Sequence, residues 1–105
     1  MKRTSPSIVH YEVTAIVHDD LVAAWERYLP GHVKDVLATG CFLEAAIEHG
    51  DAGHYRCRYA AAGQPVLERY LAEHAPALRA HVLGRFPQGI EFRRAVWTEW
   101  LQVAP

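Results

Sequence analysis

The segment His54–Tyr59 constrains the fold more than any other part of the chain, because polar and apolar residues alternate strictly along it. Its two tyrosines and its cysteine share one parity, whereas its histidine and two arginines share the other. This alternation is typical of a β-strand with one buried and one solvent-facing side. The chain is therefore expected to contain a sheet, one face of which is covered by other elements.

Three more segments alternate in the manner of strands: residues 8–17, residues 41–48 and a last strand that begins at Gly89-Ile90. Residues 41–48 and 54–59 are expected to form a hairpin, since the two glycines among residues 49–53 suit a turn. In the last strand the alternation slips at Arg93-Arg94, which predicts a bulge or a change of exposure.

Two segments with helical spacing separate these strands. The first begins after aspartates at residues 19–20 and ends at Gly40, and Pro30-Gly31 is expected to leave one kinked helix or two short ones. The second begins at residues 63–65, where a proline suits the first turn of a helix. It is expected to kink at Ala75-Pro76 and to end at Gly84, before Pro87.

The order of elements is strand, helix, strand, strand, helix, strand. With right-handed crossovers, this order predicts an α+β fold, the ferredoxin-like βαββαβ sandwich. Its four-stranded antiparallel sheet would have the first and third strands at the centre and two kinked helices on one face, so the other face stays open. The 105 residues are expected to form a single domain, residues 1–105, of which residues 1–7 are a flexible N-terminus.

Charge and composition argue against several classes of function. Eleven Lys and Arg against twelve Asp and Glu give a net charge of −1, without the basic excess that favours nucleic-acid binding. We find no secretory signal and no apolar stretch of about 20 residues, so we expect a cytoplasmic location and no membrane partner. The two cysteines and seven histidines form no cluster with metal-ligand spacing, so no metal or other cofactor is expected.

The open sheet face is expected to carry most of the candidate site residues, which by parity are His10, Glu12, Glu44, Arg56 and Arg58. A turn at residues 49–53 would place Glu48 beside His54 and Glu44 beside Arg58, while Glu12 and Arg56 could meet at mid-strand.

Two interpretations of these charges stay open. They form a solvated ladder of ion pairs, each worth about 0–1 kcal/mol, or they line a polar chamber that a partner subunit closes. In the chamber, Arg56 and Arg58 would bind a carboxylate or carbonyl group of a small ligand, because a guanidinium group captures such groups in a bidentate manner.

His32 is a further candidate, since Asp35 follows it by one helical turn and could orient the imidazole. It would then act as a general base at the rim of the sheet; the alternative is a solvated or capping histidine at a helix start.

A homodimer is expected, because a monomer would expose apolar surface to solvent at Phe42 on the open face and at Trp97 and Trp100 near the C-terminal end. An RNA-recognition module is not expected, since the tyrosines of the third strand point under the helices.

The chain resembles a small bacterial family of uncharacterised proteins, a domain of unknown function. The resemblance covers nearly all of the chain after residue 8, and it rests on four segments: His32–Phe42, Tyr55–Tyr59, Tyr70–Arg79 and Arg85–Pro87. That family is similar to the dimeric α/β-barrel superfamily, whose members pair their open sheets. The superfamily includes cofactor-free monooxygenases, isomerases, haem-using relatives and proteins without known activity, and this chain has no evident haem-ligand motif.

Three functions follow as hypotheses. The chain is a homodimer that binds a small polar or anionic molecule on the open face, or a non-catalytic dimerising protein with a structural or regulatory role. By the resemblance, it is a cofactor-free enzyme similar to the monooxygenases or isomerases.

Overall fold

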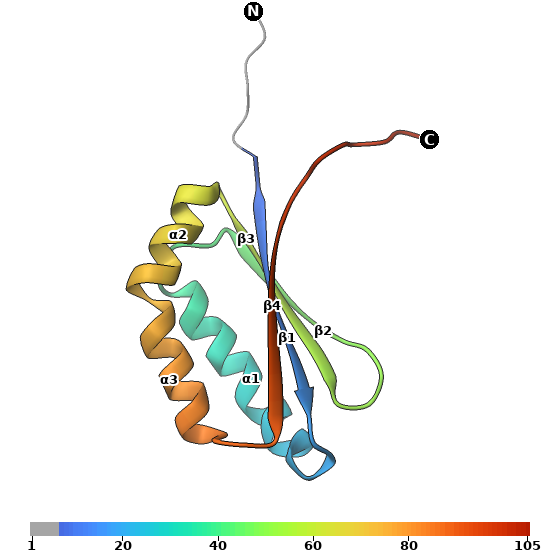
Figure 1. Cartoon of the computed structure of the whole chain (residues 1–105), viewed down its shortest axis with the longest axis vertical. Coiled ribbons are helices and arrows are strands. Elements are labelled where there is room, and N and C mark those ends of the chain that lie inside the picture. The colour runs from blue at the N-terminus through green and yellow to red at the C-terminus, as the bar shows by residue number, and fades with distance from the viewer. Residues whose placement is uncertain (1–6) are drawn as a thin grey trace, which may run out of the picture.

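The computed structural model describes residues 7–105, so the expected flexible N-terminus falls, apart from Ser7, outside the described residues. The four strands form one antiparallel sheet in the order β2-β3-β1-β4, which confirms the two central strands. Three helices cover one face of this sheet, and the other face is open (Figure 1). The elements in chain order are β1 (Val9–Val17), the short 3-10 helix η1 (Asp19–Leu21), α1 (Val22–Leu37), β2 (Glu44–His49), β3 (His54–Ala61), α2 (Gln64–Glu73), α3 (Ala75–Arg85) and β4 (Ile90–Thr98).

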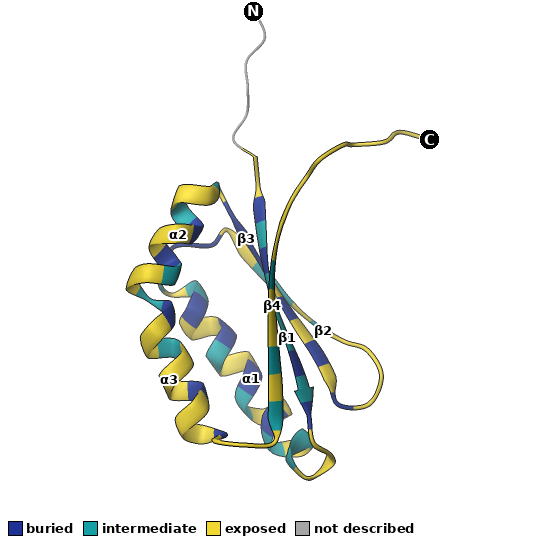
Figure 2. Ribbon diagram, in the orientation of Figure 1, coloured by how far each residue is buried: buried dark blue, intermediate teal, exposed yellow. Residues whose placement is uncertain are grey.

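The core lies between the sheet and the helices, where the buried positions of both layers face each other (Figure 2). In β3 the aromatic parity is buried and the arginine parity is exposed, as its sequence predicts. The buried residues of α1 recur every three or four positions, which places them on one side of the helix. They are Trp25, Leu29, Val33 and Val36.

The two helical segments differ from each other in how proline affects them. The first segment is one continuous helix, α1, with Pro30 inside it, so of the two expected alternatives the single helix is observed and the pair of short helices is wrong. Pro30 and Gly31 lie on the exposed side, and the buried stripe continues past them, which offsets the roughly 3 kcal/mol that proline costs inside a helix. The second segment does divide, into α2 and α3 at His74, just before Ala75-Pro76. Within residues 7–105, no helix is both long and apolar enough to cross a membrane.

Phe42 does not lie on the open face, so that prediction is wrong. Strand β2 begins only at Glu44, and the strict alternation of sides does not extend to the residues before it. The Phe42 side chain therefore turns toward the helices, where the residue is 8% exposed. Its ring centroid lies 4.7 Å from that of Tyr70 and 5.1 Å from that of Tyr59, so packing against these aromatic rings determines its direction.

The hairpin between β2 and β3 turns more tightly than expected. Gly50 N donates to His54 O at 3.0 Å, which leaves a three-residue loop that ends in Gly53 at φ +80°. The shorter loop shifts the register by two residues. Glu48 therefore lies opposite Arg56, not His54, and Glu44 lies opposite Ala60, not Arg58.

Strand β4 contains no bulge. It pairs with β1 in unbroken register from Ile90 to Thr98, so the slip in the sequence pattern is the expected change of exposure, with Arg93 and Arg94 both exposed. Arg93 points to the open face, and Arg94 shares the helix-facing side with Phe92. Because β4 is an edge strand, both guanidinium groups still reach solvent.

Candidate functional site

The register brings some of the predicted open-face residues together and separates others. Arg56 and Arg58 lie side by side with Glu48, whose carboxylate accepts a hydrogen bond from Arg56 Nε at 2.8 Å and lies 3.8 Å from Arg58. Glu12 instead accepts from the indole nitrogen of Trp97 at 2.9 Å. Glu48, which was not among the predicted site residues, is the carboxylate that holds both arginines.

His10 and Glu44 lie on either side of Ala60 in one row across the open face, and this row ends at Trp97. The neighbouring row contains Arg58. The Glu48 pairs are solvent-exposed, and the hydrogen bond from Arg56 holds the pKa of the Glu48 carboxyl below its usual value. On a single copy this arrangement is an ion-pair ladder, worth about 0–1 kcal/mol per pair.

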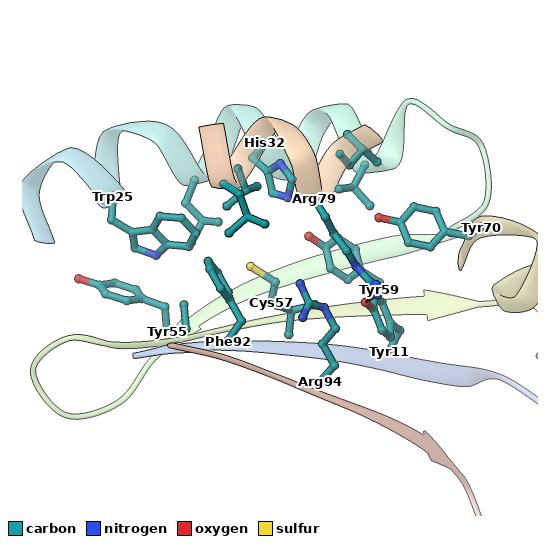
Figure 3. A pocket seen from close by; sticks show the side chains of 17 residues that line it. Tyr11, Trp25, His32, Tyr55, Cys57, Tyr59, Tyr70, Arg79, Phe92 and Arg94 are labelled. Carbon is teal, nitrogen blue, oxygen red and sulfur yellow. Dashed lines mark hydrogen bonds between the residues drawn. The ribbon is translucent and has the colours of Figure 1, made fainter. Parts of the chain in front are cut away.

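A cavity of about 210 Å³ lies on the other side of the sheet, between the sheet and the helices (Figure 3). Strands β1, β3 and β4 form its floor, and α1 and α3 form most of its roof. The most exposed lining residues, Arg79, Leu83 and Arg94, belong to α3 and β4, so the cavity opens between these two elements.

Trp25 carries the one buried side-chain nitrogen or oxygen that lacks a hydrogen-bond partner within the described part of the chain. The residue is 3% exposed and lines the cavity, where its indole nitrogen faces the interior in Figure 3. A buried donor without an acceptor costs about 1–3 kcal/mol. An oxygen atom of a molecule in the cavity would satisfy this donor.

Two charged residues line the cavity, and both are arginines, Arg79 and Arg94. Arg79 donates to the hydroxyl of Tyr11 at 3.0 Å, which ties α3 to the floor. The guanidinium carbon of Arg94 lies 5.8 Å from the centroid of the Phe92 ring. Among the described lining residues there is no carboxylate, so the mouth of the cavity favours an anionic group.

Burial and hydrogen bonding keep one thiol and three tyrosines of the wall uncharged at neutral pH. Burial raises the pKa of the Cys57 thiol to about 11 and that of Tyr70 to about 12, and it also raises the pKa of Tyr59. Tyr55 donates to a Glu26 carboxylate oxygen at 2.6 Å, and this bond raises its pKa to about 12. The thiol is therefore a poor nucleophile, since the thiolate is its reactive form.

His32 lies on α1 in the roof of this cavity, between the helices and the sheet, and not at the rim of the sheet. Its ring stacks on Tyr28 at 5.8 Å between centroids. Burial lowers the pKa of His32, and Asp35 offsets only part of that effect. Because its imidazole is neutral near pH 7, His32 is the lining side chain best able to accept a proton there.

The low pKa of His32 predicts a loss of stability in acid. The unfolded chain binds this proton near the usual pKa of about 6.5 and the folded chain only at lower pH, so protonation favours unfolding. We expect the free energy of unfolding to decrease as the pH falls from 7 to 5, measured by urea unfolding. His32→Gln should flatten this slope, whereas the exposed His49→Gln should keep it; equal slopes for wild type and His32→Gln would contradict the assignment.

No group of three or more His, Cys, Asp or Glu side chains within residues 7–105 is arranged to hold a metal ion.

The sequence alone did not predict the cavity, because its key residues come from separate elements: Trp25 from α1, Arg79 from α3 and Arg94 from β4. One signal was present in the sequence. Arg94 follows Phe92 by two residues, and in a regular strand it therefore shares the covered side. An arginine on that side indicates a polar opening next to the core.

Solved structures with low sequence identity share this fold. A conserved protein of unknown function from Bacteroides thetaiotaomicron, described as a possible oxidoreductase, has a TM-score of 0.70 at 10% identity and covers 90% of this chain and 100% of its own. MupZ from Pseudomonas fluorescens has a TM-score of 0.68 at 10% identity and covers 91% of this chain and 71% of its own. A dimeric ferredoxin-like protein from an uncultured marine organism has a TM-score of 0.55 at 13% identity and covers 94% of this chain and 100% of its own.

These likenesses confirm the ferredoxin-like α+β fold. Comparison with curated proteins finds no similar sequence. A family model, however, matches residues 8–102, nearly the whole of the described chain, and so confirms the resemblance to a domain of unknown function. The chain belongs to the family described as domain of unknown function DUF4286.

Proposed function

We propose that this chain binds a small, largely aromatic molecule in the cavity between the sheet and the helices. The observation that carries the proposal is the unpartnered indole nitrogen of Trp25 in the wall of a 210 Å³ cavity. An apolar cavity of about 150 Å³ is known to hold benzene, so this one has room for a somewhat larger ring system. Aromatic side chains of the floor and roof, such as Tyr59 and Phe92, offer surfaces for a flat molecule.

The polar groups define two further properties of the ligand. It carries an oxygen that accepts a hydrogen bond from Trp25, and an acidic group that meets Arg79 and Arg94 at the mouth. Because Cys57 and Tyr70 carry no negative charge at neutral pH, they do not offset the positive charge that Arg79 and Arg94 give to the wall. A carboxylate or phenolate on an aromatic ring has this combination of properties.

Binding of 6-hydroxy-2-naphthoate, which carries an oxygen at one end and a carboxylate at the other, tests the proposal by isothermal titration calorimetry, with 6-hydroxy-2-naphthamide as the uncharged probe of the same shape. We expect 6-hydroxy-2-naphthoate to bind more tightly than the amide. Trp25→Phe should weaken 6-hydroxy-2-naphthoate binding about tenfold, which corresponds to the roughly 1.4 kcal/mol of one hydrogen bond. Arg79→Met should weaken it at least as much, because it removes a charge-assisted contact.

Arg56→Met is the matched control, since it removes an arginine from the open face. It should leave binding unchanged in a protein of unchanged circular dichroism. If Arg56→Met weakens binding and Trp25→Phe does not, the ligand lies on the open face and the proposal is wrong.

The second proposed function is self-association through the open sheet face. This face carries both signs of charge in mixed order, an arrangement that suits pairing with a second copy related by a two-fold axis. It also carries Trp97, which is 57% exposed. One structure of the same fold is described as a dimeric ferredoxin-like protein, which supports this proposal. Light scattering should give the mass of two chains, and a single-chain mass at all micromolar concentrations would overturn it.

A further inference from the structure

The residues after β4 form an extended arm that leaves the domain. The chain continues beyond the end of the sheet in Figure 1, and all residues from 99 to 105 are exposed. Trp100 is 93% exposed, Leu101 65% and Val103 79%. Large apolar side chains on an extended segment are typical of a surface that binds another element.

The arm is poorly suited to fold back on its own sheet. The last paired residue of β4 is Thr98, opposite Val9 at the end of β1, so the arm starts where the sheet ends. A return to the open face would need a tight turn directly after Thr98. Residues 99–103 contain no Gly, Pro, Asn or Asp, the residues that favour such turns, and include Trp, Leu and Val instead.

The base of the arm is already continuous with the open face. Trp97 lies on that face, where its indole nitrogen donates to Glu12 at 2.9 Å and leaves the ring facing outward. On the same face Ala95 lies opposite Glu12, and Ala60 lies in the row of Trp97, across His10. The open face therefore offers small side chains near the base of the arm, against which a large apolar side chain from another molecule can pack.

We propose that residues 99–103 of one copy lie on the open sheet face of a second copy, with Trp100 packed beside the small residues. Two-fold symmetry makes the exchange reciprocal, so each arm covers the other copy. The inference rests on the proposed self-association, and it identifies the segment that contributes most of its apolar contact. We choose a second copy as the partner because Trp97 connects the arm directly to the open face, which carries charges of both signs.

Two leucines of nearly equal exposure supply a matched comparison. Leu101 is 65% exposed in the arm, and Leu43 is 64% exposed directly before β2, outside the arm. Sedimentation equilibrium of Trp100→Ser and Leu101→Ser should show a dimer dissociation constant raised about tenfold or more. Leu43→Ser should leave it unchanged. The melting temperature at concentrations where the chain is monomeric should be the same for all variants.

A photo-reactive phenylalanine analogue at position 102, in a mixture of ¹⁴N- and ¹⁵N-labelled chains, locates the arm. We expect cross-links between chains of different label, to peptides of β1 or β3. A dimer of undiminished affinity in the Trp100→Ser and Leu101→Ser variants would overturn the inference and leave the self-association intact. Cross-links only within one chain would also overturn it, and a protein that is always monomeric would overturn both.

Discussion

Phe42→Ala is expected to lower the free energy of unfolding by about 3–5 kcal/mol, the range for truncation of a buried aromatic side chain. Phe42 is 8% exposed and packs against Tyr59 and Tyr70, with a further stacked contact to Tyr11 at 6.4 Å. Its removal leaves a hole between the start of β2 and α2, because these rings also pack on each other and cannot all move into the space.

The neighbouring Leu43→Ala is the control for this result. Leu43 is 64% exposed, so its truncation should change stability by no more than about 0.5 kcal/mol. Urea unfolding of both variants measures the difference. If Phe42→Ala also changes stability by less than about 1 kcal/mol, Phe42 lies on the open face, as its parity in the sequence predicts.

Gly53→Ala is expected to lower the free energy of unfolding by about 2–3 kcal/mol. Gly53 has φ +80°, where a Cβ atom is strained, and this atom would lie 2.6 Å from the carbonyl oxygen of Val17. Since Val17 N also donates to Gly53 O at 2.8 Å, the loop has little freedom to move away without loss of that hydrogen bond.

Gly31→Ala is the matched change, because Gly31 lies inside α1 and an added Cβ would meet nothing within 4 Å. It should stabilise the protein by up to about 1 kcal/mol, the difference in helix propensity between alanine and glycine. Thermal unfolding of both variants measures the contrast. Equal effects of the two substitutions would contradict the close approach of the Gly53 loop to β1.

The fold was predictable because its signals are local and repeated. The alternation in His54–Tyr59 identified the covered side of β3, and the order of strands and helices was enough to predict the central position of β1 and β3. The error at Phe42 occurred because a local pattern competes with a distant contact: the side chain follows its aromatic neighbours, not strand parity. Pro30-Gly31 left one helix or two open, and the single helix α1 forms because the buried stripe extends beyond Pro30.

The candidate site was less predictable than the fold. Parity correctly placed Glu12, Arg56 and Arg58 on the open face, but the exact pairs depend on the length of the hairpin loop, which differs by two residues from the prediction. The cavity depends on which side chains of α1, α3 and β4 meet across the core. No spacing within one segment contains that information, so Trp25 and Arg79 were recognisable only in three dimensions.

The most direct test of the ligand cavity is the indole N–H resonance of Trp25 in a ¹⁵N-labelled protein during titration with 6-hydroxy-2-naphthoate. The described chain has three tryptophans, and only Trp25 lines the cavity, while Trp97 and Trp100 lie on the open face and on the arm. The Trp25 resonance should move downfield and saturate, because its N–H gains an acceptor, and the other two should stay in place. Saturable movement of the Trp97 resonance with a stationary Trp25 resonance would contradict the cavity and place the ligand on the open sheet face.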